Sequence, residues 1–208
     1  MRKQKRIILI ILALAFLVGT STAAEPASST FPAHWARSVQ MEGVPNFCKV
    51  SGNLYRSGQP TAVGLRNLED MGIKTVINLR SSHSDRDKIA STGLGCENIH
   101  MKAWHPEEQQ AVKFLKIVTD NKRGPFLVHC QHGADRTGTM CAVYRIAVQG
   151  WTKEEALKEM TEGGFGFHGI WGNLIEWINK LDIEEIKERA GIKERPEPVA
   201  SPKKYPTN

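Results

Sequence analysis

Three features that would mark a special class of protein are missing from this sequence. Its 208 residues contain no internal repeat, which excludes a solenoid or a repeat array. The apolar run over residues 7–18 covers about 18 Å as a helix, short of the roughly 30 Å of a hydrocarbon core. The formal charge is +6, but four of these charges precede residue 7, and the remaining +2 is too small for a nucleic-acid-binding surface. The length suits one soluble domain that does not bind nucleic acid.

Acidic residues are also absent from residues 1–24, which have the order of a secretory signal peptide. A basic stretch ends at Arg6, the apolar run follows, and small residues lead up to Ala24. This order predicts cleavage after Ala24 and a periplasmic or secreted protein of bacterial type, with an uncleaved anchor as the alternative. After cleavage we expect a monomer that has no stable association with the membrane.

Cysteine is scarce, with four residues at irregular spacing: Cys48, Cys96, Cys130 and Cys141. Outside the cytosol an even number of cysteines suggests disulfides, and a pair between Cys48 and Cys96 is conceivable. A domain of this length has enough core to fold without them. Cys130 would have to stay reduced to act as a nucleophile.

Strand-like and helix-like segments alternate over residues 46–190. Runs of apolar and β-branched residues predict strands over 47–50, 54–57, 73–79, 96–101 and 125–129. Helical spacing and capping residues predict helices over 61–71, after Asp85, from Pro106 as the first helical residue, over 137–149, from a cap at Thr152, and over 170–190 with a break near Asp182. This alternation predicts an α/β three-layer sandwich, a central mostly parallel sheet flanked by helices. Residues 25–45 are expected to be an irregular lead-in, and residues 191–208 a disordered tail.

The most informative segment covers residues 128–138 and reads VHCQHGADRTG. It leads from a buried strand through a tight loop into a helix, and the small residues Gly133 and Ala134 let the loop curl so that its backbone N–H groups converge. Such a nest at a helix N-terminus binds a tetrahedral dianion and stabilises a thiolate at Cys130. We therefore expect seven consecutive residues to bind phosphate: Gln131, His132, Gly133, Ala134, Asp135, Arg136 and Thr137.

Two side chains of this segment have specific expected roles. Arg136 carries a planar fork that can hold two phosphate oxygens, a geometry that lysine cannot copy. The hydroxyl of Thr137 could bond the sulfur and ease its departure. A metal held by His129, Cys130 and His132 is not expected, because adjacent side chains diverge and the sequence offers no second cluster of ligands.

His-Cys, five residues and then Arg-Thr-Gly resembles the signature loop of the cysteine-dependent protein tyrosine and dual-specificity phosphatases. Residues 54–60 (LYRSGQP) and 78–80 (NLR) also resemble the compact, atypical dual-specificity branch found in bacteria, fungi and plants. The resemblance implies the cysteine-phosphatase fold, with residues 46–190 as the phosphatase domain. It implies two-step hydrolysis without metal or cofactor, in which Cys130 attacks phosphorus and water cleaves the resulting phosphocysteine. It also implies that His129 bonds the loop backbone near the sulfur.

The sequence departs from the family at the general acid. The family places an aspartate on a mobile loop well before the cysteine, but no aspartate lies between residues 88 and 119. His105 is the first candidate to replace it, because its segment occupies the place of the acid loop; a solvated loop histidine is the alternative. Asp135 is the second, because some atypical members carry aspartate immediately before the arginine. Its alternative role is to bond loop N–H groups or Arg136.

Other residues near the expected site are weaker candidates. Arg80 ends its strand at the same edge as Cys130 and is expected either to bind substrate or to form a structural ion pair. Residues 165–168 form either a wall of the pocket, with a place for water, or part of the core. Four further acids are remote candidates for the proton donor or are expected to start a helix: Asp85, Asp87, Glu107 and Glu108.

The leading hypothesis is a phosphomonoester hydrolase acting on phosphorylated proteins, with phosphotyrosine first and phosphoserine or phosphothreonine as further substrates. Phosphoinositides or soluble polyphosphates are the alternative within the same chemistry. Sulfur transfer and arsenate reduction also use a cysteine above an anion nest, but the Arg-Thr-Gly ending favours phosphate chemistry. A non-catalytic phosphate-binding module is the remaining alternative, supported only by the missing aspartate.

Overall fold

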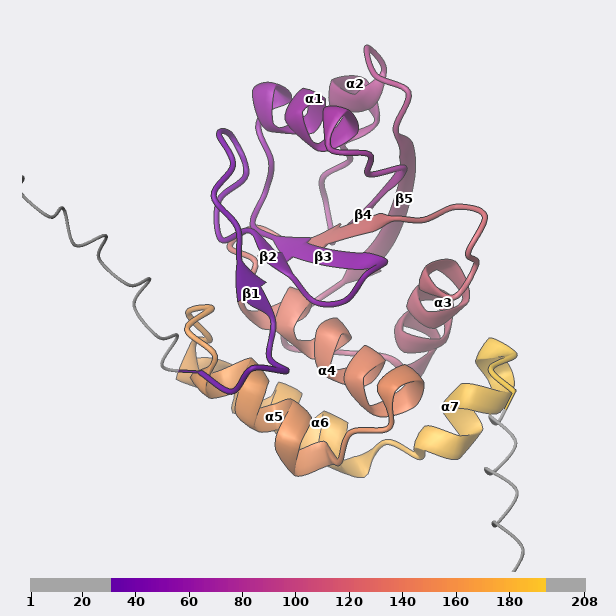
Figure 1. Cartoon of the computed structure of the whole chain (residues 1–208). Helices are drawn as coiled ribbons and strands as arrows, with labels where there is room; N and C mark the ends of the chain where they lie inside the picture. Colours follow the sequence, from indigo (N-terminus) through magenta and orange to yellow (C-terminus); the bar gives the residue numbers. More distant parts are fainter. Residues whose placement is uncertain (1–30, 194–208) are drawn as a thin grey trace, which may run out of the picture. The chain divides into compact units, whose positions relative to one another are not determined.

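A six-stranded sheet forms the centre of the protein in the computed structural model, which describes residues 31–193 (Figure 1). The strand order is β1-β2-β3-β6-β4-β5. The first two strands run antiparallel at one edge, whereas β3, β6, β4 and β5 are parallel to one another. The strands are β1 (Arg37–Ser38), β2 (Cys48–Lys49), β3 (Leu54–Ser57), β4 (Thr75–Arg80), β5 (Gly95–Met101) and β6 (Phe126–His129).

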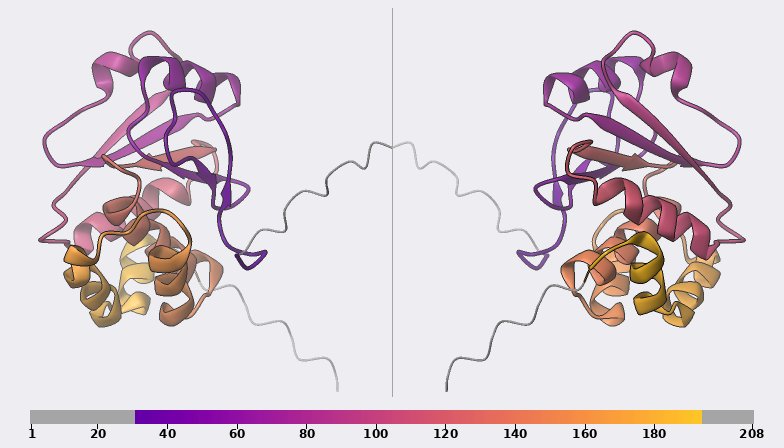
Figure 2. Two further views of the ribbon diagram at one scale, coloured as in Figure 1. Left: turned by 90° about the vertical axis from the view of Figure 1, so that its left-hand side faces the viewer. Right: turned by 90° about the vertical axis from the view of Figure 1, so that its right-hand side faces the viewer.

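Helices cover both faces of this sheet (Figures 1 and 2). One face carries α1 (Ala62–Asp70) and α2 (Arg86–Ile89). The other carries α3 (Glu108–Val118), α4 (Asp135–Gln149), α5 (Lys153–Glu162), α6 (Gly172–Lys180) and α7 (Ile183–Ala190). The predicted three-layer α/β sandwich is therefore confirmed. No helix within residues 31–193 has the length and apolarity needed to cross a bilayer.

The buried strands supply side chains to two hydrophobic cores at once. In β6, Phe126 and Val128 pack into the core with α3 and α4, whereas Leu127 packs into the core with α1. In β4, Ile77 packs into the core with α3 and α4, and Val76 packs into the core with α1. Successive side chains on a strand point to opposite faces, so a continuous apolar run fills both layers.

Most helix ends follow the capping signals in the sequence. The side chain of Thr61 accepts from the amide of Gly64 at 3.1 Å where α1 begins. Thr152 and Glu155 form the predicted capping box of α5. Gly150 ends α4 with a φ of 75°, a conformation that glycine adopts without strain.

The prediction that Pro106 is the first helical residue is wrong by two residues, because α3 begins at Glu108. Glu107 remains extended, with φ −126° and ψ 142°, and its amide donates to Oε1 of Gln110 at 3.0 Å. This bond satisfies the amide outside the helix. Both glutamates lie at the helix start, as predicted.

The sheet order also excludes a disulfide between Cys48 and Cys96. Cys48 lies on β2 and Cys96 on β5, with β3, β6 and β4 between them. Four strand spacings separate the two residues by about 19 Å, whereas a disulfide needs Cα atoms within about 7 Å. All four cysteines are free thiols.

The predicted ends of the chain lie largely outside the described residues. The predicted signal peptide, residues 1–24, is not described, nor is the predicted tail beyond residue 193. The described part of the predicted lead-in is mostly irregular, but Arg37 and Ser38 form strand β1 within it and pair with β2.

Candidate active site

Strand β6 comes last in the sequence but lies in the middle of the parallel strands, between β3 and β4. Its final residue, His129, pairs with Ser57 of β3 and with Asn78 of β4. Cys130 follows at the carboxyl end of β6, and α4 begins at Asp135, two residues earlier than predicted. Ligands bind parallel sheets at this edge, so the segments that follow β3 and β4 flank the loop on both sides.

The loop between β6 and α4 turns its carbonyl groups outward. The carbonyl oxygen of Gln131 accepts from the amide of Gln59 at 3.1 Å, and that of His132 accepts from Nδ2 of Asn46 at 3.1 Å. Within the described part of the chain, none of the amides of residues 131–136 donates to an acceptor. Outward carbonyls and unused inner amides are the arrangement of an anion-binding nest.

Arg56 of β3 holds the next carbonyl. Its side chain is only 1% exposed, and its Nη2 donates to the carbonyl oxygen of Gly133 at 2.7 Å. The guanidinium also lies 3.8 Å from the ring centroid of Phe165, so a carbonyl and an aromatic face together compensate this buried cation. Sequence reasoning missed this role; the signal was an arginine inside an otherwise buried strand.

Gly133 is required by the close approach of the loop to the end of β3. Its φ is 77°, and a Cβ atom there would lie 2.4 Å from the amide nitrogen of Gly58 and 2.5 Å from the carbonyl carbon of Ser57. Both contacts are with backbone, which cannot move aside. A side chain at this position would therefore open the loop.

Three side chains can act on an anion in the loop. Cys130 is 2% exposed at the base of the loop. Arg136 donates one weak bond to the carbonyl of Met101 at 3.4 Å, which leaves most of its fork for phosphate oxygens. The hydroxyl of Thr137 is buried without a partner among the described residues. Buried hydroxyls are nearly always bonded, so this donor is suited to a group that arrives with the reaction.

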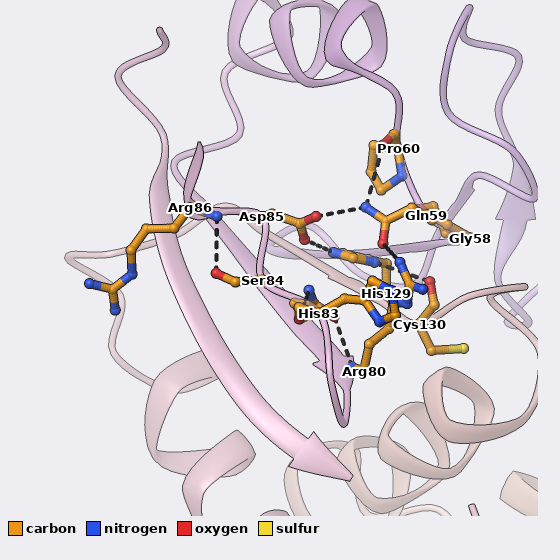
Figure 3. Close-up of polar contacts among 12 residues, drawn as sticks. Gly58, Gln59, Pro60, Arg80, His83, Ser84, Asp85, Arg86, His129 and Cys130 are labelled. Carbon is orange, nitrogen blue, oxygen red and sulfur yellow. Dashed lines mark hydrogen bonds and ion pairs between the residues drawn. The ribbon is translucent and has the colours of Figure 1, made fainter. Parts of the chain in front are cut away.

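A buried network lies behind Cys130 (Figure 3). Nε2 of His129 lies 2.7 Å from Oδ2 of Asp85, and its Nδ1 lies 3.1 Å from the carbonyl oxygen of Cys130. The two side chains are 0% and 1% exposed. The ring of His129 thus bonds the loop backbone, as the family resemblance implies, but its second partner was not anticipated. The thiol of Cys130 points away from this network in Figure 3.

Asp85 is held as a carboxylate. Burial by itself would raise the pKa of Asp85, but hydrogen bonds from His129 and Gln59 and the positive charges of His129 and Lys88 outweigh burial and bring that pKa below its ordinary value. Gln59 donates from Nε2 to Oδ1 of Asp85 at 2.7 Å and accepts from Arg80 at 2.8 Å. An ionised carboxylate cannot donate a proton, so this environment disfavours Asp85 as the acid.

A cavity of about 270 Å³ opens beside the loop. Its lining includes Gln131, Arg136, Arg80 and two tryptophans, Trp104 and Trp171. Trp104 is 65% exposed, so the rim offers aromatic surface to a substrate. Among the described residues Arg80 has no ion pair, and its position on the cavity wall fits the substrate-binding alternative.

The two predicted candidates for the acid differ in their surroundings. The side chain of His105 is 70% exposed in the turn after β5, and its Nε2 lies 3.9 Å from a carboxylate oxygen of Glu107. Asp135 is buried, and its Oδ1 accepts from the backbone amide of His168 at 2.9 Å. Nδ1 of His168 lies 3.0 Å from each oxygen of the same carboxylate. Asp135 therefore bonds the segment 165–168 rather than Arg136.

One trio of side chains near the loop has ligand atoms within 4.8 Å of one another: His132, Asp135 and His168. The carboxylate of Asp135 is already bonded twice by His168, and the rings of His132 and His168 lie 5.5 Å apart. These bonds account for the arrangement of the three side chains without a metal ion, so we assign no metal to the trio.

The layered fold, with a cysteine directly after β6 and an arginine in the first turn of α4, defines the class of cysteine-dependent phosphatases. The chain matches a family model described as DSP-PTPase phosphatase fused to NAD+ kinase over residues 32–171. It is 32% identical over 184 residues to dual specificity protein phosphatase TpbA of Pseudomonas aeruginosa, covering 88% of this chain and 83% of that protein. It is 30% identical over 163 residues to the putative tyrosine-protein phosphatase OCA1 of Meyerozyma guilliermondii, covering 70% of this chain and 85% of that protein.

Solved structures agree with these relatives. The crystal structure of Pseudomonas aeruginosa TpbA matches with a TM-score of 0.68 at 30% identity, covering 77% of this chain and 97% of that one. A cysteine-to-serine form of TpbA in complex with pTyr matches with a TM-score of 0.67 at 29% identity, covering 77% and 96%. The chain belongs to the DSP/PTP-like phosphatase family, as an atypical homologue of TpbA and OCA1, and it is a hydrolase of phosphomonoesters.

Proposed function

We propose that this protein dephosphorylates phosphotyrosine on exported proteins, with Cys130 as the nucleophile and Arg136 as the clamp on the phosphate. The observation that carries the proposal is the loop geometry. Three successive carbonyls are bonded from outside, at Gln131, His132 and Gly133, and a buried cysteine lies at the loop's base. That arrangement directs the amides of the loop toward one anion.

The reaction has two balanced steps. In the first, the Cys130 thiolate attacks phosphorus, an S–P bond forms, and the P–O bond to the leaving oxygen breaks. The loop amides and Arg136 bind the three equatorial oxygens, where the negative charge is spread in the transition state. In the second, water attacks phosphorus, the S–P bond breaks, and inorganic phosphate leaves. The hydroxyl of Thr137 donates to the departing thiolate in this step.

His105 is the proton donor in this proposal. Both oxygens of Asp135 are already engaged by His168, through its backbone amide and its Nδ1. His105 follows the cavity residue Trp104, and its Nε2 lies 3.9 Å from a carboxylate oxygen of Glu107. Asp135 then serves to position His168 beside the loop.

Leaving groups of different basicity test this assignment. His105→Gln is expected to slow hydrolysis of phenyl phosphate by about 10²-fold and to leave p-nitrophenyl phosphate, whose leaving group needs no proton, almost unchanged. Asp135→Asn is expected to lower both rates alike. If Asp135→Asn alone shows the difference between leaving groups, the donor is Asp135.

Phosphotyrosine is the proposed substrate because the cavity beside the loop has an aromatic rim. Trp104 and Trp171 can pack against a tyrosyl ring, and Arg80 can bond an acidic neighbour or a backbone carbonyl of the peptide. The TpbA structure solved with pTyr supports the same substrate. A panel of phosphotyrosyl, phosphoseryl and phosphothreonyl peptides, phosphoinositides and soluble polyphosphates tests it. A larger kcat/KM for any non-protein member would overturn the proposal.

Export is proposed from residues 1–24, whose basic start, short apolar run and small residues have the order of a signal peptide. Fractionation of cells that express the full chain is expected to recover activity outside the inner membrane. The mature protein is expected to begin at Glu25 by N-terminal sequencing. Activity confined to the cytosolic fraction, or a retained Met1 on a membrane-bound protein, would contradict this part.

The decisive test of the chemistry compares the parent with Cys130→Ser and Arg136→Lys on p-nitrophenyl phosphate. We expect both variants to fold and Cys130→Ser to lose at least roughly 10³-fold in kcat. Acid quenching of the parent should capture phosphate bound to Cys130, identified by mass spectrometry. A Cys130→Ser variant that keeps its rate would exclude the phosphocysteine route.

A further inference from the structure

The ring of His129 lies between two hydrogen-bond acceptors. A carbonyl oxygen can only accept, so Nδ1, at 3.1 Å from the carbonyl oxygen of Cys130, carries a hydrogen. Nε2 faces Oδ2 of Asp85 at 2.7 Å, and two lone pairs at that distance would repel each other. A proton therefore lies between them, and its position depends on the other bonds of Asp85.

The donor and the acceptor of each of these bonds can be assigned starting from Arg80, because its side chain has donors only. Its Nη1 donates to Oε1 of Gln59 at 2.8 Å, which identifies that atom as the oxygen of the amide. Nε2 of Gln59 then donates to Oδ1 of Asp85 at 2.7 Å (Figure 3). Asp85 thus receives a hydrogen bond on each oxygen, which favours its ionised form and leaves both protons on His129.

We propose that Asp85 is a positioning residue for the phosphatase reaction: it keeps His129 as an imidazolium behind Cys130, and this charge keeps the Cys130 thiol ionised at neutral pH. The proposal rests on the proposed role of Cys130 as the nucleophile. It also gives a purpose to the two family-like segments, residues 54–60 and 78–80, because Gln59 and Arg80 come from them.

Burial makes the arrangement effective. The side chains of His129 and Asp85 are 0% and 1% exposed, so water does not screen them. The imidazolium adjoins the backbone of Cys130, whereas the carboxylate lies on the far side of the ring. The positive end of the pair is therefore nearer to the sulfur, and a nearby positive charge favours a thiolate.

Other charged groups around the pair do not replace this effect. Arg86 and Lys88 of α2 and Cys96 and Glu97 of β5 interact with Asp85 or with its neighbour Cys96. On the side of the loop, Arg136 donates to the carbonyl of Met101, Arg56 donates to the carbonyl of Gly133, and Arg80 donates to Gln59. Among the described residues, Asp85 is the one charged side chain that forms a hydrogen bond or ion pair with the His129 ring.

Asp85→Asn tests the proposal, with Asp87→Asn as the matched control, because Asp85 caps α2 and Asp87 is an exposed acid in the first turn of that helix. The rate of alkylation of Cys130 by iodoacetamide is measured against pH, which reports thiolate without phosphatase turnover. In Asp85→Asn we expect the midpoint to rise by about one pH unit, a tenfold slower alkylation near pH 6, and an equal shift in the acidic limb of kcat/KM. Asp87→Asn is expected to match the parent.

The ring nitrogens of His129 give a second, spectroscopic measurement. Both should carry protons in the parent at neutral pH by ¹⁵N NMR, and only one in Asp85→Asn. Should Asp85→Asn not fold, Gln59→Met removes only the bonds of the side chain and is expected to shift the alkylation midpoint in the same direction by a smaller amount.

An unshifted midpoint in a folded Asp85→Asn variant, or a singly protonated ring in the parent, would overturn the proposal and leave the phosphatase function intact. A failure of the proposed phosphatase function itself is recognised by a different experiment. In that case the Cys130→Ser variant keeps its activity, whatever the alkylation profile of Asp85→Asn.

Discussion

Nη2 of Arg56 donates to the carbonyl oxygen of Gly133 at 2.7 Å, a bond that joins residues 77 positions apart in the chain. It connects β3, which lies in the family-like segment 54–60, with Gly133, where the phosphate loop approaches the end of β3 most closely. The shape of the loop therefore depends on a buried side chain that lies outside the loop, on β3.

Arg56→Lys is expected to weaken this connection while keeping the positive charge. Lysine cannot reproduce the planar contact with Phe165 together with the bond to Gly133, so a buried carbonyl is left unsatisfied. We expect a loss of about 2 kcal/mol in the free energy of unfolding, measured in urea, and weaker orthovanadate binding. Arg37→Lys, on the exposed strand β1, should change the stability by less than about 0.5 kcal/mol.

Thr137→Val is expected to separate chemistry from stability. The hydroxyl is buried without a partner among the described residues, so its removal should not lower the free energy of unfolding. Breakdown of the phosphocysteine should slow, giving a burst of p-nitrophenol in stopped-flow measurements. Thr139→Val, whose hydroxyl already donates to the carbonyl of Asp135 at 2.9 Å, should show no burst. Equal burst behaviour in the two variants would exclude a role for Thr137 in the second step.

The four thiols should differ sharply in reactivity. Burial raises the pKa of Cys141 to about 11 and also raises the pKa values of Cys48 and Cys96. A raised thiol pKa means that the thiolate forms only at higher pH, so iodoacetamide at pH 7 is expected to modify Cys130 alone. Peptide mass spectrometry checks this, and modification of Cys96 before Cys130 would contradict it.

The stability of the protein should depend on acid pH through Asp85. Its pKa in the folded state lies below the ordinary value of about 3.9, so its contribution is complete above that value and is lost as the pH falls through the folded pKa. The parent should exceed Asp85→Asn in free energy of unfolding by about 3 kcal/mol near pH 6, because Asp85→Asn breaks a buried pair. Urea titrations from pH 6 to pH 3 should show this difference shrinking below about pH 4. If the difference in free energy of unfolding grew toward low pH, the predicted direction of the pH dependence would be wrong.

The layers of the fold and the strand–loop–helix around Cys130 could be predicted because they depend on local patterns. The apolar run over 125–129 and the small residues of the loop give the pattern of a buried strand that leads into a nest. Capping residues such as Thr152 likewise act within one helical turn and gave the correct start of α5.

The contacts that support the site could not be predicted, because they depend on which strands become neighbours. Asp85 reaches His129 across 44 positions only because β4 pairs with β6. The same ordering separates Cys48 from Cys96, which a count of cysteines cannot reveal. Sequence gave no reason to distinguish Asp85 from Asp87, although one is buried in an ion pair and the other is exposed.

The central place of β6 has a consequence for how the protein folds. Strands β3 and β4 cannot complete their ladders until residues 126–129 insert between them, so completing the sheet requires contacts between distant chain segments. A chain that ends before this strand would expose two open strand edges and would be prone to aggregate. The enzyme therefore has no partly assembled, partly active form: the insertion that finishes the sheet also brings the nucleophile into position.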